Sequence, residues 1–381
     1  MSKIRLVENQ VPWWNTEFGP QEIEAVSRAI SSRRISQGLL TAEFEEKVAH
    51  LLDVNYVIAA SNGSVALLMA LLSLEIGKGD EVVVPNRTWI ATMHAVMMAG
   101  ATPVLADVRQ DQPLLDPSEV ERAISERTKA IIPVHLNGRA ADLQHFNCLA
   151  NEHGLVVIED AAQAMMSRTG GKTLGTIGNV GCFSLSMAKI ISTGQGGLLS
   201  TNDESIAERL RLIRTHGVEN VQDPKSWGEF PGLNFRFTDL QAAIGLVQAE
   251  KLPERIEKLK AVYSEYCTGF EDCAAIQVVP VAVETGEIPL YTEILCEDRK
   301  LLAEYLKHCG IETRPALPNM NRAKYLKECA DSFPCSDIFE KHGLTLPSGP
   351  GQKMEDIRFV IQCIQGFFER KGSTIDSPRE R

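Results

Sequence analysis

The sequence is poor in aromatic residues and has neither a surplus of positive charge nor a long apolar run. Aromatic residues make up 6% of its 381 residues, and the formal net charge is −11. Because binding along a phosphate backbone needs a surplus of Lys and Arg, we do not expect nucleic acid as the main partner. No apolar run approaches the roughly 20 residues that a membrane-spanning helix needs, so no membrane association is expected.

The nine cysteines form no disulfide framework that the sequence reveals. None belongs to a Cys-x-x-Cys pair, and an odd number cannot all pair within one chain. The N-terminus carries Glu8, Asn9, Gln10 and the pair Trp13–Trp14, which is not a secretory pattern. These features predict reduced thiols and a cytoplasmic protein.

Three common catalytic or binding motifs are incomplete. Gly170-Gly-Lys-Thr173 resembles the end of a phosphate-binding P-loop, but position 166, where that motif needs glycine, is Met166. No Gly-x-Gly-x-x-Gly follows an early strand. The eight histidines show no His-Glu-x-x-His spacing, so no catalytic metal is expected.

A fourth motif, Ser186-Met-Ala-Lys189, matches the Ser-x-x-Lys of penicillin-recognising hydrolases. Those enzymes also need a later Ser-Asp-Asn and a later Lys-Thr-Gly. This chain has only Ser336-Asp-Ile, and Lys172-Thr173 precedes the serine. A serine hydrolase is therefore the weakest of the alternatives.

Short apolar runs alternate with amphipathic stretches through the first 250 residues. Strands are predicted at 56–60, 82–84, 102–106, 130–134 and 155–158, and helices at 20–34, 43–52, 65–74, 88–99, 117–125 and 141–153. This alternation is typical of an α/β fold with a mostly parallel sheet covered by helices on both faces. Ligands of such sheets gather at the carboxyl ends of strands, where Asp107, His135, Asp160, Trp89 and the turn 61–64 fall.

The pattern changes near Leu252–Pro253, which predicts a second, smaller unit. Beyond it, β-like pieces at 276–283 and 290–295 alternate with helices at 299–309 and 354–368, as in an α+β lobe. We therefore expect four parts: an N-terminal strap at 1–17, a large α/β domain at 18–252, a small α+β domain at 253–370 and a disordered tail at 371–381.

A polar stretch at 217–234 carries Trp227, Phe230 and Asn234. Its length predicts a functional loop or one that reaches a partner subunit.

The segment 155–197 carries the most specific chemical signal. Its apolar strand ends in Glu159–Asp160, and Lys189 follows 29 positions after Asp160, in front of Gly194-Gln-Gly-Gly197. A carboxylate at a strand end and a lysine in a glycine-bordered turn suit a protonated pyridine cofactor held as a Schiff base. Apolar neighbours such as Phe183 would make a free Lys189 ammonium costly to bury. Asp160 alone can equally cap a helix at Ala161, but the pair together favours catalysis.

The turn Ser61-Asn-Gly-Ser64 precedes a predicted helix. A turn of small residues at a helix start presents free backbone N–H groups to an anion, so it is a candidate phosphate cradle or a plain N-cap.

Several separated motifs together resemble one known family. They are Ser61-Asn-Gly-Ser64-Val-Ala-Leu, Glu159-Asp-Ala-Ala-Gln163-Ala, Gly181-Cys-Phe-Ser184, Lys189, Gly194-Gln-Gly-Gly197 and Asn234-Phe-Arg-Phe-Thr-Asp239-Leu-Gln-Ala. In this order they resemble the DegT/DnrJ/StrS-type sugar aminotransferases, which are pyridoxal phosphate-dependent enzymes of fold type I. The resemblance runs from about Trp14 to about Ile364, and several ordered motifs are far more specific than any one alone.

The resemblance implies roles at the cofactor ring. Lys189 would form the Schiff base with pyridoxal 5'-phosphate, and Asp160 would pair with the pyridine nitrogen and keep it protonated. Gln163 would contact the side of the ring that bears the hydroxyl, and Trp89 would stack on the ring face.

The resemblance also implies a phosphate site shared between two subunits. The backbone of Ser64 and Val65, with the hydroxyl of Ser184, would hold the phosphate. Asn234 matches the family residue that reaches the phosphate of the neighbouring subunit. The resemblance therefore implies a homodimer with its active site at the interface.

The implied reaction moves an amino group from L-glutamate to a keto sugar, with Lys189 as general acid and base. One branch of the family has histidine in place of this lysine and dehydrates its substrate instead, so Lys189 implies transamination. A catalytically idle relative that binds cofactor or sugar as a sensor is the remaining alternative.

The segment Gly310-Ile-Glu-Thr-Arg314-Pro resembles the perosamine-synthase-like branch of the family, which narrows the choice of substrate. This resemblance implies that Arg314 lies near the sugar. His135 and Asn137 are further predicted substrate-binding residues. Two segments depart from the family. The common His-Leu-Tyr-Gly is here His135-Leu-Asn137-Gly138, and an aromatic-rich segment is here Ile288-Pro-Leu-Tyr291-Thr-Glu-Ile. A nucleotide-linked keto-deoxy hexose and a free keto sugar acid, such as an 8-keto derivative of 3-deoxy-octulosonate, are both compatible. Either substrate would serve the synthesis of surface polysaccharide.

Overall fold

The computed structural model describes residues 10–218, 222–223, 225, 227, 231–326 and 332–375. Three sequence predictions fall partly outside this range. They concern residues 1–9 of the strap, residues 219–221, 224, 226 and 228–230 of the loop (Phe230 included), and residues 376–381 of the tail.

Seven strands form the central sheet in the order β1-β9-β8-β5-β4-β2-β3. They are β1 (Tyr56–Ala60), β2 (Glu81–Pro85), β3 (Thr102–Ala106), β4 (Thr128–Ile131), β5 (Val156–Asp160), β8 (Val180–Ser184) and β9 (Gly197–Thr201). Only β9 runs against its two neighbours, β1 and β8, and the remaining pairs are parallel. The predicted α/β fold with a mostly parallel sheet is confirmed.

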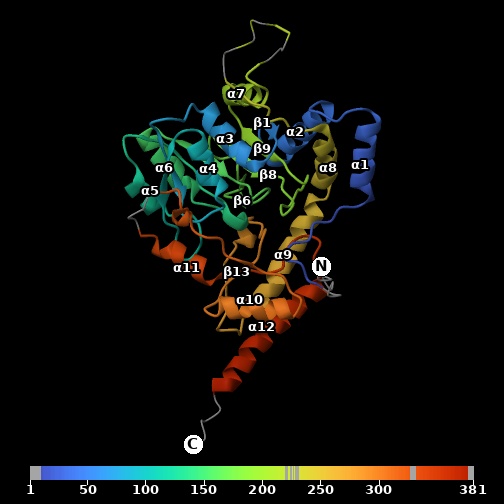
Figure 1. The fold of residues 1–381 in the computed structure, drawn as a ribbon, viewed down its shortest axis with the longest axis vertical. Helices are drawn as coiled ribbons and strands as arrows, with labels where there is room; N and C mark the ends of the chain where they lie inside the picture. The colour runs from blue at the N-terminus through green and yellow to red at the C-terminus, as the bar shows by residue number, and fades with distance from the viewer. Residues whose placement is uncertain are drawn as a thin grey trace, which may run out of the picture.

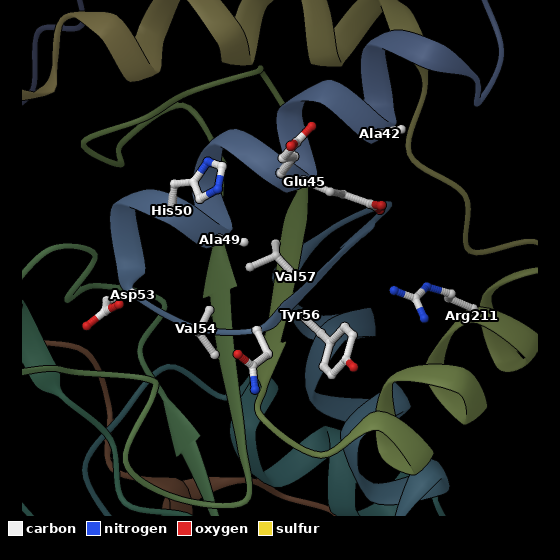
Figure 2. Close-up of a pocket in the computed structure, with 11 residues that line it drawn as sticks. Ala42, Glu45, Ala49, His50, Asp53, Val54, Tyr56, Val57 and Arg211 are labelled. Carbon is white, nitrogen blue, oxygen red and sulfur yellow. The ribbon is translucent and has the colours of Figure 1, made fainter.

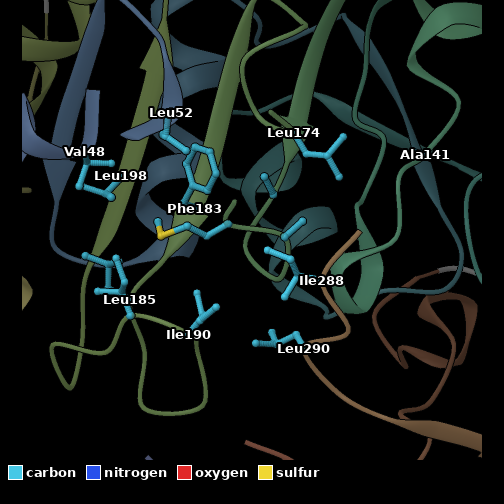
Figure 3. Packing of buried hydrophobic residues seen from close by; sticks show 14 of the residues in the cluster. Val48, Leu52, Ala141, Leu174, Phe183, Leu185, Ile190, Leu198, Ile288 and Leu290 are labelled. Carbon is cyan, nitrogen blue, oxygen red and sulfur yellow. The ribbon is translucent and has the colours of Figure 1, made fainter. Parts of the chain in front are cut away.

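Helices cover both faces of this sheet (Figure 1). They are α1 (Pro20–Ser31), α2 (Leu39–Leu52), α3 (Gly63–Ser73), α4 (Ala91–Met98), α5 (Pro117–Ala123), α6 (Leu143–His153), α7 (Glu204–Arg214) and α8 (Asp239–Glu250). Successive strand residues point to opposite faces, so Val157 packs with α2, α5, α6 and α8 while Ile158 packs with α3, α4 and α7. Figure 3 shows the first of these cores, where Phe183 lies beside Leu52 and Leu198.

Helix α1 turns its isoleucines away from the core. Ile23 and Ile30 are 69% and 56% exposed, whereas Ala25 and Ala29 are buried and pack with residues of α8. Glu22 is buried with them because its carboxylate accepts hydrogen bonds from Lys251 Nζ and Gln248 Nε2, at 2.6 and 2.7 Å. The helical spacing therefore predicted the helix, but small residues and a paired glutamate face the protein.

A second sheet of four antiparallel strands has the order β10-β11-β13-β12. It contains β10 (Gln277–Val278), β11 (Glu293–Leu295), β12 (Arg314–Pro315) and β13 (Gly343–Thr345). Its neighbours are α9 (Leu252–Gly269), α10 (Arg299–His308), α11 (Pro334–His342) and α12 (Met354–Ile375), with short 3-10 turns η3 (Val283–Thr285) and η4 (Met320–Arg322). Helix α9 runs from the large sheet towards α10 and α12 (Figure 1).

Helix α12 is longer than the sequence pattern indicated. It continues to Ile375, so residues 371–375, expected to be a disordered tail, are helical. Among the described residues, no helix is long and apolar enough to span a bilayer.

The segment that resembles a P-loop is a hairpin between β6 (Arg168–Thr169) and β7 (Lys172–Thr173). Gly170 and Gly171 form its turn with φ of +54° and +81°, which glycine adopts without strain. A P-loop precedes a helix, so this geometry excludes a phosphate cradle here.

Candidate active site

A cavity of about 770 Å³ lies at the carboxyl ends of the central strands, where the second sheet meets the first. Of the residues predicted from the sequence, eight line it: Ser64, Trp89, Asn137, Asp160, Gln163, Ser184, Lys189 and Arg314. Val65, His135 and Asn234 do not. Residues that are far apart in the sequence thus meet at the sheet edge where the α/β pattern places a ligand.

Asp160 is the last residue of β5 and is 5% exposed. Its carboxylate accepts hydrogen bonds from Thr92 Oγ1 at 2.8 Å and from the Ala162 backbone N–H at 3.2 Å. Burial raises the pKa of Asp160, while these hydrogen bonds and the nearby Lys189 oppose the shift. No helix begins at Ala161, so Asp160 is not a helix cap. Thr92 was not predicted from the sequence, although its position one turn after Trp89 in the predicted helix 88–99 was a signal for it.

Lys189 lies in the turn between β8 and β9. Its Nζ donates to the hydroxyl of Tyr291 at 3.5 Å, and that hydroxyl donates to the Ala188 carbonyl. Burial lowers the pKa of Lys189 to about 8, while the negative charge of Asp160 raises it. The amine hydrogen-bonds to Tyr291 and not to Ser186 in the described chain, which argues against a Ser-x-x-Lys hydrolase.

Two tryptophans pack against Tyr291, the hydrogen-bond partner of Lys189, and Trp13 also lines the cavity. The ring centroids of Trp13 and Trp14 lie 5.6 and 5.3 Å from that of Tyr291, and Trp14 Nε1 donates to the Met187 carbonyl at 3.1 Å. The N-terminal segment is therefore tied to the turn that carries Lys189. No role in the site was predicted for the tryptophan pair from the sequence.

The start of helix α3 is an N-cap that also borders the cavity. Asn62 Oδ1 accepts the Val65 N–H at 2.9 Å, so the Val65 amide is already used by the cap. A Cβ on Gly63 would lie 2.9 Å from the Ser184 Cβ, so only glycine lets β8 approach this closely. Ser64 and Ser184 both line the cavity beside the positive end of the helix, which suits a phosphate group.

His135, predicted at the substrate, is fully buried outside the cavity. Its Nε2 lies 2.9 Å from Glu159 Oε2, and its Nδ1 accepts the Ala141 N–H at 3.1 Å. Since Nδ1 is an acceptor, Nε2 carries the proton that Glu159 accepts. Neither nitrogen is left for a substrate, because Glu159 and the Ala141 N–H already bind them.

Asn137 and Gln163 lie together on the cavity wall. Gln163 Oε1 accepts the Asn137 N–H at 2.9 Å, which leaves the Gln163 amide nitrogen for a ligand. Asn137 is in the 3-10 turn η1 (Leu136–Gly138) with a φ of +55°, a conformation that asparagine tolerates.

Two predicted residues lie at the margin of the site. Arg314 is exposed on the cavity wall, pairs with Glu312 at 2.7 Å and lies over the Trp13 ring at 5.3 Å. Asn234 is exposed outside this cavity and makes an antiparallel bridge with Thr215.

A second hollow, of about 620 Å³, shares no residue with this cavity and lies between α2, β1 and α7 (Figure 2). His50, Asp53, Tyr56 and Arg211 line it. Its most buried acid, Glu45, already binds Arg214 Nη1 and the Ala59 N–H. No group of three His, Cys, Asp or Glu side chains in the described chain is arranged to hold a metal ion, there or elsewhere.

The residues of the first cavity fit pyridoxal phosphate. A buried carboxylate suits a protonated ring nitrogen, a lysine with a lowered pKa suits an aldehyde, and the start of α3 with Ser184 suits a phosphate. The volume of about 770 Å³ lies within the usual range for a cofactor and substrate site.

Comparison with known proteins gives the family. The model of the DegT/DnrJ/EryC1/StrS aminotransferase family matches residues 17–365. GDP-perosamine synthase from Caulobacter vibrioides is 36% identical over 336 residues, which is 86% of this chain and 90% of that protein. The dTDP-3-amino-3,4,6-trideoxy-alpha-D-glucose transaminase of Streptomyces venezuelae is 33% identical, over 95% of this chain and 97% of its own.

Solved structures agree with the sequence relatives. The structure of S. venezuelae DesV in complex with a ketimine intermediate superposes with a TM-score of 0.86 at 32% identity, covering 91% of this chain and 94% of that one. The chain therefore belongs to the DegT/DnrJ/EryC1/StrS aminotransferase family, and it is a pyridoxal phosphate-dependent sugar aminotransferase.

Proposed function

We propose that this enzyme transfers the amino group of L-glutamate to a keto sugar destined for surface polysaccharide such as lipopolysaccharide. The observation that carries the proposal is that Asp160, at the end of β5, and Lys189, in the turn 29 positions later, line one cavity. The relatives named as a GDP-perosamine synthase and a dTDP-amino sugar transaminase support a keto sugar as acceptor.

Pyridoxal phosphate, when bound, supplies an aldehyde that takes up an amino group and a ring that accepts electrons. In our proposal Asp160 keeps a proton at the ring nitrogen, Gln163 binds the ring hydroxyl and Trp89 covers the ring face. Lys189 moves the proton at the reacting carbon. Its pKa of about 8 favours this role, because a general base works best when its pKa lies near the working pH.

We place the phosphate group at the start of α3, with the Ser64 backbone and the Ser184 hydroxyl as its ligands. Val65 contributes less than the sequence suggested, since its N–H is held by Asn62. The exposed Asn234 is then free to serve the phosphate of a second copy, which makes the working enzyme a homodimer.

The division of the chain follows the same proposal. We take residues 18–252 as the cofactor-binding domain, 253–370 as the small domain and residues before 18 as a strap, because helix α9 starts at Leu252 between the two sheets. All cysteines that the structure describes are free thiols, which supports a cytoplasmic enzyme.

On the acceptor side, we assign Arg314 and Asn137 to substrate binding. Both line the cavity, and Arg314 lies at its exposed margin. A nucleotide-linked keto-deoxy hexose would extend past Arg314 to solvent, whereas a free keto sugar acid would be enclosed.

Spectroscopy of the cofactor-loaded protein tests the proposal. We expect a yellow protein absorbing near ~420 nm, a colour that L-glutamate bleaches and a suitable keto sugar restores. K189A should lose both colour changes while keeping the wild-type circular dichroism spectrum. A wild-type protein whose colour L-glutamate leaves unchanged, or a K189A variant with normal turnover, would refute the assignment.

A further inference from the structure

Arg87 follows strand β2 and is held in place from one side. The residue is only 6% exposed. Its Nη1 donates to the Leu317 carbonyl at 2.7 Å and to Asn319 Oδ1 at 3.3 Å. The guanidinium therefore joins the large sheet to the segment after β12 and has a fixed orientation.

The other edge of the same guanidinium is unused. Arg87 Nε is buried without a hydrogen-bond partner, and within the described part of the chain neither Nε nor Nη2 donates to any group. A buried polar group without a partner is costly, and a buried charge without one is more so. This free edge is the fork with which arginine binds carboxylate or phosphate in a bidentate manner.

Two other buried arginines pair with a carboxylate, which Arg87 lacks, while the buried Arg255 binds only uncharged oxygens of Glu17, Ile190 and Gln248. Arg139 pairs with Glu293 at 2.8 Å and Arg214 with Glu45. Glu293 stabilises the charged form of Arg87 from a distance, but its carboxylate already accepts from Arg139. Within the described residues, no acid lies within salt-bridge distance of Arg87.

Arg87 lines the cavity together with Trp89, Arg314 and Leu317. Its contacts are with residues 317 and 319, whereas the proposed phosphate cradle is built from residues 62–65 and 184. An anion at Arg87 would therefore be a second anionic group, separate from the cofactor phosphate.

We propose that Arg87 forms an oxyanion subsite of the active-site cavity, where a carboxylate or phosphate of the substrate binds to Nε and Nη2. The inference rests on the proposed function, since it places that reaction's substrate in this cavity. The anion can come from three sources: the side-chain carboxylate of the amino donor, the carboxylate of a sugar acid, or the diphosphate of a nucleotide-linked sugar.

Calorimetric binding to the cofactor-loaded protein tests the subsite without turnover. The probes are glutarate for the donor, 3-deoxy-octulosonate for a sugar acid and GDP for a nucleotide-linked sugar. We expect R87Q to weaken binding of at least one probe by roughly 10- to 100-fold, since a hydrogen bond to a charged group contributes about 1.5–3 kcal/mol. R87K keeps the charge but lacks the fork, so its affinity should fall between those of R87Q and wild type.

The matched control is R322Q. It removes the same charge from the neighbouring turn η4, where Arg322 pairs with Asp337 and Glu340. R322Q should bind every probe as the wild type does. The probe whose binding R87Q weakens identifies the source of the anion.

The subsite is refuted if R87Q and R87K bind all probes like the wild type, if no probe binds the wild type, or if R322Q loses as much affinity as R87Q. Thermal unfolding and the cofactor spectrum of each variant show whether the fold is kept. If R87Q does not fold, R87K decides. Bleaching of the wild type by L-glutamate tests the proposed function separately, so either proposal can fail alone.

Discussion

Glu159 and Asp160 are neighbours in sequence with opposite surroundings. Asp160 lines the cavity, whereas the Glu159 carboxylate is turned to the other side of β5 and is fully buried. There it accepts the backbone N–H groups of Gly175, Ile177 and Gly178 at 2.6–2.7 Å, besides the proton of His135. Glu159 is thus a positioning residue, which fixes the glycine-rich connection that lies behind Asp160.

Replacing the buried Glu159 carboxylate should destabilise the folded protein. E159A leaves three backbone N–H groups and the His135 Nε2–H without an acceptor, so we expect a loss of about 3–5 kcal/mol in the free energy of unfolding. Urea denaturation of the cofactor-free protein measures it. E152A on the exposed face of α6 is the control, and equal midpoints for the two variants would contradict the role given to Glu159.

The Lys189 amine should titrate far below an ordinary lysine in the cofactor-free protein. Its pKa of about 8 is lowered by burial and partly restored by Asp160. Acylation by an amine-reactive reagent, followed at Lys189 by mass spectrometry, should therefore reach half its maximal rate near pH 8. D160N removes the charge that raises this pKa, so its midpoint should move lower; a midpoint that rises or stays would contradict the coupling.

The same shift has a consequence for stability. The unfolded chain keeps the Lys189 proton up to about pH 10.4, whereas the folded chain loses it near 8. Between these values the unfolded state binds more protons, so the stability of the cofactor-free protein gains a contribution that grows as the pH rises. K189M should lack that contribution, which denaturation at pH 7 and pH 10 can measure.

At the scale of elements, the two segments that depart from the family pattern lie against each other. The Leu290 N–H donates to the Asn137 carbonyl at 3.3 Å, and a Cβ on Gly138 would lie only 1.7 Å from the Ile288 carbonyl oxygen. The turn at 136–138 and the segment 288–291 therefore form one unit of the cavity wall. It carries Asn137 on one side and Tyr291, the partner of Lys189, on the other.

Two glycine substitutions test this contact. Gly138 and Gly154 both have positive φ, +88° and +66°, but nothing lies within 4 Å of a Cβ at Gly154. G154A should cost only the backbone strain of about 1–2 kcal/mol. G138A should lower the free energy of unfolding by about 1–3 kcal/mol more than G154A does, because its Cβ must displace the Ile288 backbone. Urea denaturation compares them.

G138A should also raise the KM for the keto sugar, since the shifted segment carries Tyr291. Equal stabilities of G138A and G154A would mean that residues 288–291 move at no cost and do not form part of a fixed wall.

The sequence predicted the elements well because the pattern that identifies them is local. Alternation of apolar runs predicted five of the seven strands of the central sheet, all but β8 and β9, and the strand ends indicated Asp160. It did not give side-chain direction: His135 also stands at a strand end, yet both of its nitrogens bind protein groups. Trp13, Thr92 and Tyr291 were missed because their roles depend on contacts with residues about 70 to 280 positions away, which no local pattern records.

At the scale of the whole molecule, the cavity combines the central sheet, the second sheet and the N-terminal segment. Lys189 comes from the turn between two strands of the central sheet, Arg314 from the second sheet and Trp13 from the N-terminal segment. All three line the same cavity. A single chain still leaves Asn234 exposed outside the cavity. The next two residues, Phe235 and Arg236, pair with Ser61 and Ala60 at the end of β1. In the proposed homodimer this asparagine completes the neighbour's phosphate site, so each subunit depends on the other.

Mixing two inactive variants tests this dependence. K189A lacks the reacting amine but keeps Asn234, and N234A keeps the amine but cannot complete its neighbour's site. In a hybrid dimer the N234A subunit receives Asn234 from the K189A subunit, so one of the two sites is whole. Random reassortment makes about half of the dimers hybrids, and we expect about a quarter of wild-type activity to return. Activity that stays at the level of the separate variants, with exchange of subunits verified by mass spectrometry, would mean that Asn234 does not act across an interface.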